Sequence, residues 1–395
     1  MKYTSEEVME YIREENIKFV RLAFCDVYGR QRNIAILADE LGRAFEYGIA
    51  FDASAIDGFG GDVRSDLFLH PDPATLTQLP WRPRDGGVAH MFCDITHPDG
   101  TPFDGDTRHI LQMAVREAEK AGYAFRIGSE IEFYLFRQDE NGEPTRIPYD
   151  NAGYMDIAPA DRGENVRREI CLTLERMGIL PEASHHESGP GQNEIDFRHA
   201  DPLTAADNAV TFQAVVRTIA AQYGLWADFS PRPLPDKDGS GMHVNLSASA
   251  PDIADSTPHL VAGILDRIPA MTLFLNPTEN SYERLGRDKA PGFVAWSREN
   301  RSRLIRIPAA AEPFRRLELR SPDPSANPYL AFALVLRAGM EGLAQQKQPP
   351  APTDDILPAG ALPLPRTRDE AVRAALDSDF IRAHLPERIL RAYCR

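Results

Sequence analysis

The chain has 395 residues, of which 43% are hydrophobic and 26% charged, which is typical of a globular protein with one large domain or two. Its formal net charge of −15 at pH 7 argues against a general nucleic-acid surface, although local cations could still hold an anionic substrate. The four cysteines show no paired spacing, no apolar run reaches the roughly 18–20 residues of a membrane helix, and the charged start lacks the apolar core of a signal peptide. We therefore expect a cytoplasmic protein with reduced thiols that binds neither nucleic acid nor membrane.

Residues 1–103 are expected to form a small N-terminal domain of strands and loops. Ser5 is a candidate cap for a helix over residues 4–15, where apolar residues recur at helical spacing. A loop at residues 51–61 carries Asp52 among small residues, a composition most often explained by turn geometry alone. The other predicted elements of this part are strands at 20–24, 33–36 and 88–95 and a short helix at 37–46.

Residues 104–395 are expected to form a second, larger domain in which helices alternate with strands. The predicted helices are 107–121, 161–177, 202–223, 259–268, 270–275 and 327–346, followed by a proline-rich connector at 349–365 and short C-terminal helices. The predicted strands are 125–136, two within 181–197, then 242–247, 304–307 and 316–320, with an extended segment at 227–233 and a loop-rich stretch at 276–296. This order predicts an α+β fold with a mainly antiparallel sheet.

The strand at 125–136 carries a pair of carboxylates, Glu130 and Glu132, separated by one apolar residue. Side chains alternate faces along a strand, so both acids point the same way and Ile131 points into packing. Two like charges side by side repel each other unless a cation lies between them. The pair therefore predicts a cation site on one face of the sheet.

Four further strand segments carry polar groups that share a face. They are Glu187 and Glu194 around the turn at 188–191, the set His243, Asn245 and Ser247, and the set Arg316, Glu318 and Arg320. If these strands belong to one sheet, five carboxylates and a histidine meet, and they cannot all ionise without cations. Oxygen ligands with one imidazole favour more than one Mg²⁺ or Mn²⁺ ion, and the arginines predict an anionic substrate such as a phosphate.

Each of these features taken alone has an ordinary explanation. Acids that alternate along a strand usually form its solvated face, and lone arginines are usually surface charge. His185 and His186 are each expected to be structural rather than ligands, and the Gly239-Ser240-Gly241 stretch alone indicates only a turn.

The features occur together with a specific set of short motifs. These are Phe51-Asp52-x-Ser54, Gly128-x-Glu130-x-Glu132-Phe133, His185-His186-Glu187, Gly191-Gln192-x-Glu194, Gly239-Ser240-Gly241-Met242-His243, Asn276-Pro277-Thr278 with Arg284-Leu285, Asn300-Arg301-Ser302, Ile305-Arg306-Ile307-Pro308 and Leu317-Glu318-x-Arg320-x-Pro322-Asp323-Pro324. In this combination, and over nearly its whole length, the chain resembles the glutamine synthetase family.

The resemblance implies a β-grasp-like N-terminal domain and a catalytic domain whose curved antiparallel sheet is flanked by helices. It also implies a ring-shaped homo-oligomer, with a dodecamer as the expected form, in which Asp52 serves the active site of a neighbouring subunit. The expected reaction joins L-glutamate and ammonia through a γ-glutamyl phosphate that is made with ATP. Metal ions and arginines would offset the charge that develops during phosphoryl transfer.

The resemblance also assigns residues to roles. Glu132, Glu187 and Glu194 would hold one metal ion, and Glu130, His243 and Glu318 a second. The loop at Asp238 and Gly239 would position glutamate and the transferred phosphoryl group together with Arg284, Arg301 and Arg320. The nucleotide would meet Glu182, Ser247, Arg306 and Arg316, and the ammonium pocket would consist of Asp52, Tyr154 and Glu187.

The sequence departs from the family pattern in several places. Lys289 stands directly before the Ala-Pro pair where the family has a flap glutamate, and the loop looks one residue shorter. A lysine cannot attract ammonium as a carboxylate does, whereas Asp288 could take over that role. Ala55 replaces a usual serine, Asn245 a common histidine, and Asp238 a neutral residue.

The chain also ends at Arg395, short of the usual C-terminal helices, and the connector lacks the tyrosine motif of regulation by adenylylation. We therefore expect no adenylylation.

These departures leave two alternatives to glutamine synthesis. The first is a γ-glutamyl ligase for a larger amine, such as a polyamine or an alkylamine, because Lys289 and Ala55 alter the ammonia-specific part of the site. The second is a non-catalytic regulatory member of the family. The intact set of candidate metal ligands argues against the second alternative, because clustered carboxylates are costly without metal.

Overall fold

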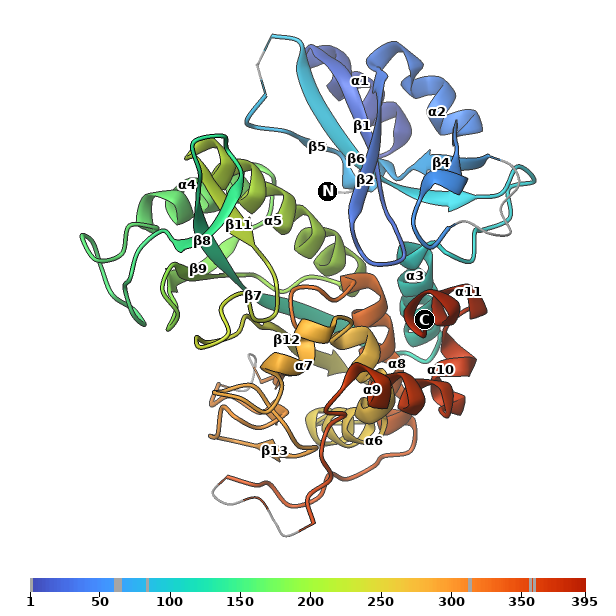
Figure 1. The fold of residues 1–395 in the computed structure, drawn as a ribbon. Helices are drawn as coiled ribbons and strands as arrows, with labels where there is room; N and C mark the ends of the chain where they lie inside the picture. The colour runs from blue at the N-terminus through green and yellow to red at the C-terminus, as the bar shows by residue number, and fades with distance from the viewer. Residues whose placement is uncertain (1–2, 60–65, 83–84, 312–314, 355–356, 358–359) are drawn as a thin grey trace.

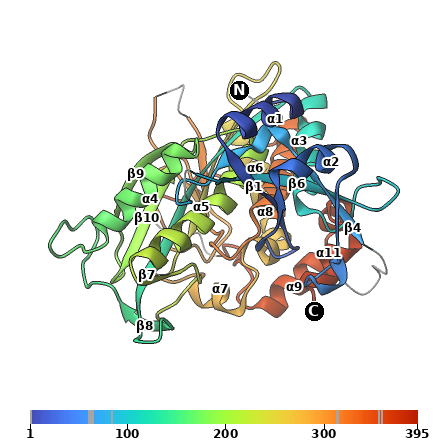
Figure 2. The same cartoon turned by 90° about the horizontal axis from the view of Figure 1, so that it is seen from above.

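The computed structural model describes residues 3–59, 66–82, 85–311, 315–354, 357 and 360–395. Gly60 and Gly61 of the predicted 51–61 loop, and parts of the 349–365 connector, lie outside these residues. Figure 1 shows a small unit built from the first hundred residues above a larger unit that contains the rest of the chain. Figure 2 shows the same arrangement from above.

The small unit is built on a six-stranded sheet, counted over the described residues. Its central strand β6 (Gly87–Thr96) pairs parallel with β1 (Ile17–Cys25), and β1 in turn pairs antiparallel with β2 (Gln31–Leu37). The remaining strands are β3 (Ile49–Phe51), β4 (Leu67–Pro71) and β5 (Thr77–Gln78), and the helices are α1 (Ser5–Glu14) and α2 (Leu41–Tyr47), with short 3₁₀ turns η1 (Ala38–Glu40), η2 (Ala53–Ala55) and η3 (Pro73–Thr75). The three predicted strands are present, but β3, β4 and β5 were missed because they are short or contain proline.

The cap of the first helix differs from the prediction. Thr4 rather than Ser5 is the N-cap, and it forms a capping box with Glu7. The Thr4 side chain accepts a hydrogen bond from the Glu7 amide, while the Glu7 carboxylate accepts one from the Thr4 amide. Both residue types cap helices well, so the sequence signal was ambiguous by one position.

The larger unit contains a nine-stranded sheet whose central strand is β7 (Ala124–Gln138). The order across the sheet is β13-β14-β15-β12-β7-β10-β9, and both β8 and β11 also pair with β7. The bounds are β8 (Pro144–Pro148), β9 (Pro181–His186), β10 (Gln192–Phe197), β11 (Leu225–Asp228), β12 (Met242–Ser249), β13 (Trp296–Ser297), β14 (Ile305–Arg306) and β15 (Leu317–Leu319). All the pairings are antiparallel except that between β13 and β14, so the predicted mainly antiparallel sheet is confirmed.

Helices pack against this sheet and against one another. They are α3 (Thr107–Lys120), α4 (Glu164–Arg176), α5 (Pro202–Gln222), α6 (Thr257–Leu275), α7 (Glu279–Arg284), α8 (Pro328–Ala344), α9 (Arg368–Leu376), α10 (Asp379–His384) and α11 (Glu387–Tyr393). The α5 helix packs on β7 and β11, and α8 packs on α3, α5 and α6. One apolar cluster, containing Phe133 and Phe212, fills the space between β7, α4 and α5.

Helix α6 corrects the prediction of two helices that end and begin around Pro269. It runs unbroken through Pro269 because its buried length packs closely on α8. At the crossing Gly263 and Gly342 bring the two backbones together, and a Cβ atom on Gly263 would lie 2.1 Å from the Ala338 carbonyl oxygen. Tertiary packing thus outweighs the roughly 3 kcal/mol that a helix-interior proline costs.

A buried ion network joins the two units. The Arg108 guanidinium on α3 contacts the Asp72 and Asp94 carboxylates of the small unit at 2.8 and 2.9 Å, and the Asp207 carboxylate on α5 at 3.1 Å. Asp207 also accepts a hydrogen bond from the Tyr329 hydroxyl at 2.6 Å. Because Arg108 is only 3% exposed, this network fixes the small unit on the helices that support the large sheet.

Candidate active site

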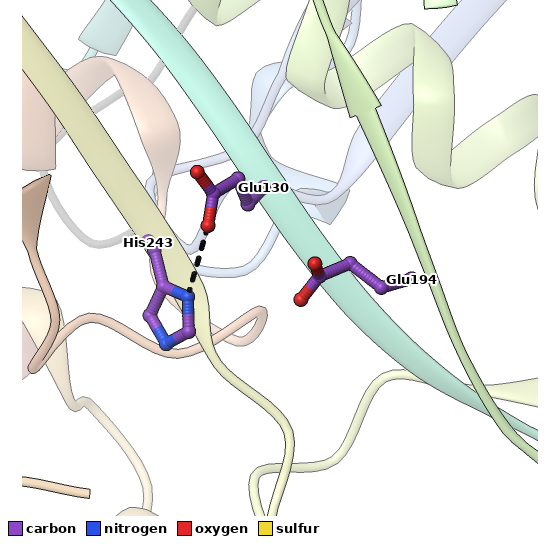
Figure 3. A group of neighbouring side chains, drawn as sticks. All are labelled: Glu130, Glu194 and His243. Carbon is purple, nitrogen blue, oxygen red and sulfur yellow. Dashed lines mark ion pairs between the residues drawn. The ribbon is translucent and has the colours of Figure 1, made fainter. Parts of the chain in front are cut away.

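The register of the large sheet sets carboxylates side by side on neighbouring strands. Glu132 on β7 lies opposite Glu194 on β10, while Glu130 lies opposite both Asp196 on β10 and His243 on β12. Since side chains two residues apart share a face, these groups all point to the same side of the sheet. Figure 3 shows Glu130, Glu194 and His243 reaching from three strands toward a common space.

The distances within this group are short enough for shared ligands. The His243 Nδ1 atom lies 3.5 Å from a Glu130 carboxylate oxygen and 3.8 Å from one of Glu318, and its Nε2 atom lies 4.0 Å from one of Glu132. One ligand atom each of Glu130, Glu194 and His243 lie within 4.8 Å of one another, and the same holds for His185, Glu187 and Glu194. Glu194 therefore belongs to both groups.

The same face lines a cavity of about 230 Å³. Most of the residues that the sequence singled out lie on its wall: Glu130, Glu132, Tyr154, Glu187, Glu194, Asp238, Gly239, His243, Arg284, Arg301, Arg306 and Arg320. Glu318 is fully buried just behind the wall, where Arg306 Nε contacts it at 2.6 Å and Arg320 forms a second ion pair with it. Arg316 donates to the Asn245 side-chain oxygen at 2.9 Å, and Asn245 donates to Glu130 at 2.8 Å.

The carboxylates differ in the neighbours that balance their charge. Burial opposes ionisation of Glu130, but the His243 and Asn245 side chains outweigh it and lower the pKa of this carboxyl to about 2. Burial and the neighbouring Glu132 raise the pKa of Glu187 to about 7, and burial and Glu130 raise that of Asp196 to about 8. Burial, with Glu132 next to it, also raises the pKa of Glu194 well above its usual value. The cluster therefore holds more negative charge than its protein neighbours balance, which is the electrostatic condition for binding cations.

A glycine-rich loop closes one side of the cavity. A Cβ atom on Gly239 would lie 2.6 Å from the Pro231 carbonyl oxygen, and one on Gly241 would lie 2.6 Å from His243 Nε2, so neither position has room for a side chain. The Glu132 carboxylate accepts hydrogen bonds from the Gly241 amide at 2.9 Å and the Gln192 side chain at 3.1 Å. Gln192 also donates to the Gly239 carbonyl at 3.1 Å, which joins the loop to the sheet.

Comparison with known proteins identifies, over nearly the whole chain, the same family that the sequence motifs resemble. Residues 16–98 match the β-grasp domain of glutamine synthetase, and residues 104–395 match its catalytic domain. The glutamine synthetase of Clostridium saccharobutylicum is 46% identical, with 89% of this chain and 82% of that protein covered. That of Methanosarcina mazei is 44% identical, with 99% and 92% covered.

The chain belongs to the glutamine synthetase family. It is an ATP-dependent carboxylate–amine ligase that forms glutamine, and the family uses divalent metal ions for which the acidic cluster offers ligands. The fold is also that of solved structures. One named "GmaS/ADP complex-Conformation 1" is 28% identical with a TM-score of 0.88, covering 98% of this chain and 94% of its own. A Plasmodium falciparum glutamine synthetase is 21% identical with a TM-score of 0.88, covering 100% and 95%.

The end of the cavity where the glutamine synthetase resemblance puts the amine is built from loops. Tyr154 is 47% exposed, and its ring stands edge-on to His185 with the ring centroids 5.5 Å apart. His185 contacts Glu194 at 3.2 Å and Glu187 at 3.6 Å, so it lies on the cavity wall beside two candidate metal ligands. The Lys289 ammonium lies 5.2 Å from the centroid of the Tyr154 ring.

Besides Arg316 and Glu318, three residues of the predicted site lie away from the cavity wall. Asp52 is exposed on the small unit, where its carboxylate accepts hydrogen bonds from the Ser54 amide and hydroxyl at 2.9 and 2.6 Å. The Glu182 side chain is 56% exposed on β9, 4.0 Å from Arg198. Ser247 lies on β12, opposite Arg126 on β7.

Arg284 is on the wall, but its guanidinium donates to the backbone carbonyls of Ser321 and Arg320 at 2.8 and 3.2 Å.

Sequence reasoning missed several residues of this site. Asp196, Gln192 and Arg287 all line the cavity, and one Asp196 carboxylate oxygen is buried without a hydrogen-bond partner among the described residues. Asp196 was detectable, because it follows Glu194 with the same spacing that marked Glu130 and Glu132. Gln192 stood in a family motif without an assigned role, and Arg287 gave no signal, since only the tertiary structure brings it to the cavity.

Across the part of the chain that the structure describes, no helix combines the length and the apolar character needed to span a lipid bilayer.

Proposed function

We propose that the cavity makes and consumes a γ-glutamyl phosphate with the residue roles that the sequence indicates. The observation that carries the proposal is the antiparallel register that sets Glu130 and Glu132 beside different partners on both neighbouring strands. Around Glu318 lie Arg306 and Arg320, which are suited to phosphate, whereas beside Glu187 lies His185 with the Tyr154 ring against it, a setting suited to an amine.

The donor set fits two divalent ions. Glu132, Glu187 and Glu194 would hold one, and Glu130, His243 and Glu318 the other, with oxygen atoms and one imidazole as expected for Mg²⁺ or Mn²⁺. The buried Asp196 oxygen without a partner and the mutual repulsion of the carboxylates support this fit. When bound, the ions would supply the positive charge that phosphoryl transfer requires.

The protein side chains handle the charge of the first step. Arg306 and Arg316 would meet the phosphates of ATP, with Glu182 and Ser247 at the nucleotide, while Arg301 and Arg320 would face the transferred phosphoryl group. The Asp238–Gly239 loop and Arg284 would position L-glutamate. Since Arg284 is bonded to the carbonyls of Arg320 and Ser321, it also fixes the backbone that presents Arg320.

The second step needs an amine that loses a proton before it attacks the acyl phosphate. Tyr154 and Glu187 would form its pocket, and Glu187 lies close to Glu132 and Lys289, which act on its pKa in opposite directions. Asp52 would complete the pocket of a neighbouring subunit in a ring, with a dodecamer as the expected form. Its exposed position on the small unit, here taken as residues 1–103, supports that role.

The test is ATP-dependent phosphate release with Mg²⁺ and L-glutamate, with ammonium compared against a panel of amines. We expect release that depends on glutamate and is fastest with ammonium. If a larger amine gives the faster release, the result supports the alternative function, a γ-glutamyl ligase for that amine. The position of Lys289 over the Tyr154 ring favours this alternative. ATP binding without turnover for every amine would overturn both reactions.

A further inference from the structure

The loop at residues 286–291, called here the flap loop, carries Arg287 and Lys289 on either side of Asp288, where the family has a flap glutamate. Its ends are tied together, because the Gly286 amide donates to the Pro291 carbonyl at 3.1 Å. A turn inside it is closed by the Ala290 amide, which donates to the Arg287 carbonyl at 2.8 Å. Gly286 has a φ of 75° and Asp288 one of 52°, so the backbone folds back sharply at both places. The flap loop is therefore a compact structure rather than an open strap.

An ion pair with Arg232 anchors the flap loop. Asp288 contacts the buried Arg232 at 3.0 Å, so the guanidinium offsets part of the charge of this carboxylate. That Asp288 could take over the role of the flap glutamate stays a prediction. Arg287, Asp288 and Lys289 all line the cavity, with the two cations on either side of the carboxylate. Among the described residues, no carboxylate lies within ion-pair distance of either cation.

Lys289 lies where the proposed amine pocket would hold a positive charge. Its ammonium is 5.2 Å from the centroid of the Tyr154 ring, and it lines the cavity together with Glu187 and Asp238. A resident cation repels a second one at short range, so a small ammonium ion gains less there than beside a carboxylate. A polyamine would meet the same repulsion with its second charge. An amine with a negative group would be attracted by both flap cations.

We propose that Arg287 and Lys289 recognise an anionic group on the amine, so that the site transfers the γ-glutamyl group to amino acids and similar amines as well as to ammonia. The inference rests on the proposed function, because it requires the acyl phosphate. The amine nitrogen attacks the γ-carbonyl carbon and the C–N bond forms. The C–O bond to phosphate then breaks, and phosphate leaves with the bonding electrons. The nitrogen gives up one proton to solvent or to a carboxylate of the site, so atoms and charge balance.

The test uses three four-carbon amines that differ only in the charge of the far end: γ-aminobutyrate, butylamine and putrescine. Phosphate release by the full chain with ATP, Mg²⁺ and glutamate gives kcat/KM for each amine. We expect γ-aminobutyrate to exceed butylamine, and butylamine to exceed putrescine, by about fivefold at each step, as for one exposed ion pair. Mass spectrometry should then find γ-glutamyl-aminobutyrate as the product.

In the variant Lys289→Glu, kcat/KM should be higher for putrescine than for γ-aminobutyrate. In Lys289→Gln, the two kcat/KM values should be about equal. The matched control is Lys237→Glu, which makes the same charge change at an exposed lysine off the cavity wall and should keep the wild-type order. An unchanged order in Lys289→Glu, or butylamine equal to γ-aminobutyrate in the wild type, would overturn the inference. Hydroxylamine, which is uncharged at neutral pH, separates the two proposals. If hydroxamate forms but the three amines show no charge preference, only the further inference is overturned. If no hydroxamate forms, the proposed function is overturned as well.

Discussion

The two faces of the β9–β10 ladder carry acids and histidines in very different settings. His185 and Glu194 are paired on one face, and the next residue pair, His186 and Asn193, lies on the other. The first face opens on the cavity, where the site cluster consists of Glu130, Glu132, Glu187, Glu194 and Asp196. The second face is buried, and its Asp150 cluster consists of Asp150, Asp161, Arg167 and His186.

Every charge of the Asp150 cluster has a partner in the protein. Arg167 contacts Asp161 at 2.5 Å and donates to the Asn193 side chain at 2.6 Å, and His186 Nε2 lies 2.9 Å from Asp150. Backbone amides of residues 152, 162 and 191 also donate to Asp150. Burial raises the pKa of an acid, yet the bond from His186 and these amides outweigh it and hold that of Asp150 at about 2.

The comparison shows that proximity alone does not identify a metal site. Three ligand atoms lie within 4.8 Å of one another in both clusters. In the Asp150 cluster an arginine and amides already supply the positive charge, so a metal ion would have to displace them. In the site cluster burial, followed by repulsion from neighbouring carboxylates, raises the pKa values of three carboxyls instead. The first cluster is expected to hold the fold, and the second to hold the ions and substrates.

The largest expected effect is the loss of folding stability when the Asp150 cluster loses its cation. Arg167→Met leaves Asp161 buried and unpaired, which should lower the free energy of unfolding by about 3–5 kcal/mol. Urea denaturation followed by circular dichroism measures it. The control Arg168→Met changes the next residue of the same helix, which is exposed, and should stay within about 0.5 kcal/mol of the wild type. Equal stability of the two variants would contradict the structural role of the cluster.

The next effect is on catalysis in the site cluster. Glu132→Ala should lower kcat/KM for ATP-dependent phosphate release by more than about 100-fold. Loss of a hydrogen-bond partner of a metal ligand costs up to about 100-fold, and loss of the ligand itself should cost more. In metal-free buffer its stability should not fall, because a repelling carboxylate is removed. An active Glu132→Ala enzyme would refute the assignment of Glu132 to the metal.

Metal ions should distinguish the clusters by their effect on unfolding. Mg²⁺ or Mn²⁺ at 100 times its Kd should stabilise the wild type by about 2.7 kcal/mol, and EDTA should remove the increment. Calorimetry with each ion measures it. Glu132→Ala should lose most of the increment, whereas Asp161→Asn should keep it despite lower stability. If Asp161→Asn loses the increment and Glu132→Ala retains it, the metal binds in the Asp150 cluster, which contradicts our proposal.

The smallest expected effect concerns the link between the sheet and the glycine loop. Gln192→Leu removes the donor that joins Glu132 to the Gly239 carbonyl, and kcat/KM should fall by about tenfold. Steady-state kinetics should show the change with ATP binding retained. Gln222→Leu, the same substitution at the exposed end of α5, is the control. Identical kinetics for the two variants would mean that Gln192 does not position Glu132.

The sequence predicted much of this molecule because much of it is set by local pattern. The period of two in β7, β10, β12 and β15 was visible in the residues, and it put Glu130 beside Glu132 on one face before any pairing was known. The long helices α3, α5 and α8 were predicted to within a few residues for the same reason. Short strands such as β3 and β13, and the passage of α6 through Pro269, depend on distant packing and were missed.

What only the tertiary structure decided is which neighbours each charge meets. The sequence shows two adjacent histidines, but strand pairing places His185 at the cavity and His186 in the buried Asp150 cluster. The sequence also shows a lysine in the flap, but the fold of the flap loop places that lysine over the Tyr154 ring. It also places Asp288 in an ion pair with Arg232. The physical reason is that periodicity is written in residues a few positions apart. The balance of charge at a site instead depends on side chains brought together from strands and loops far apart in the chain.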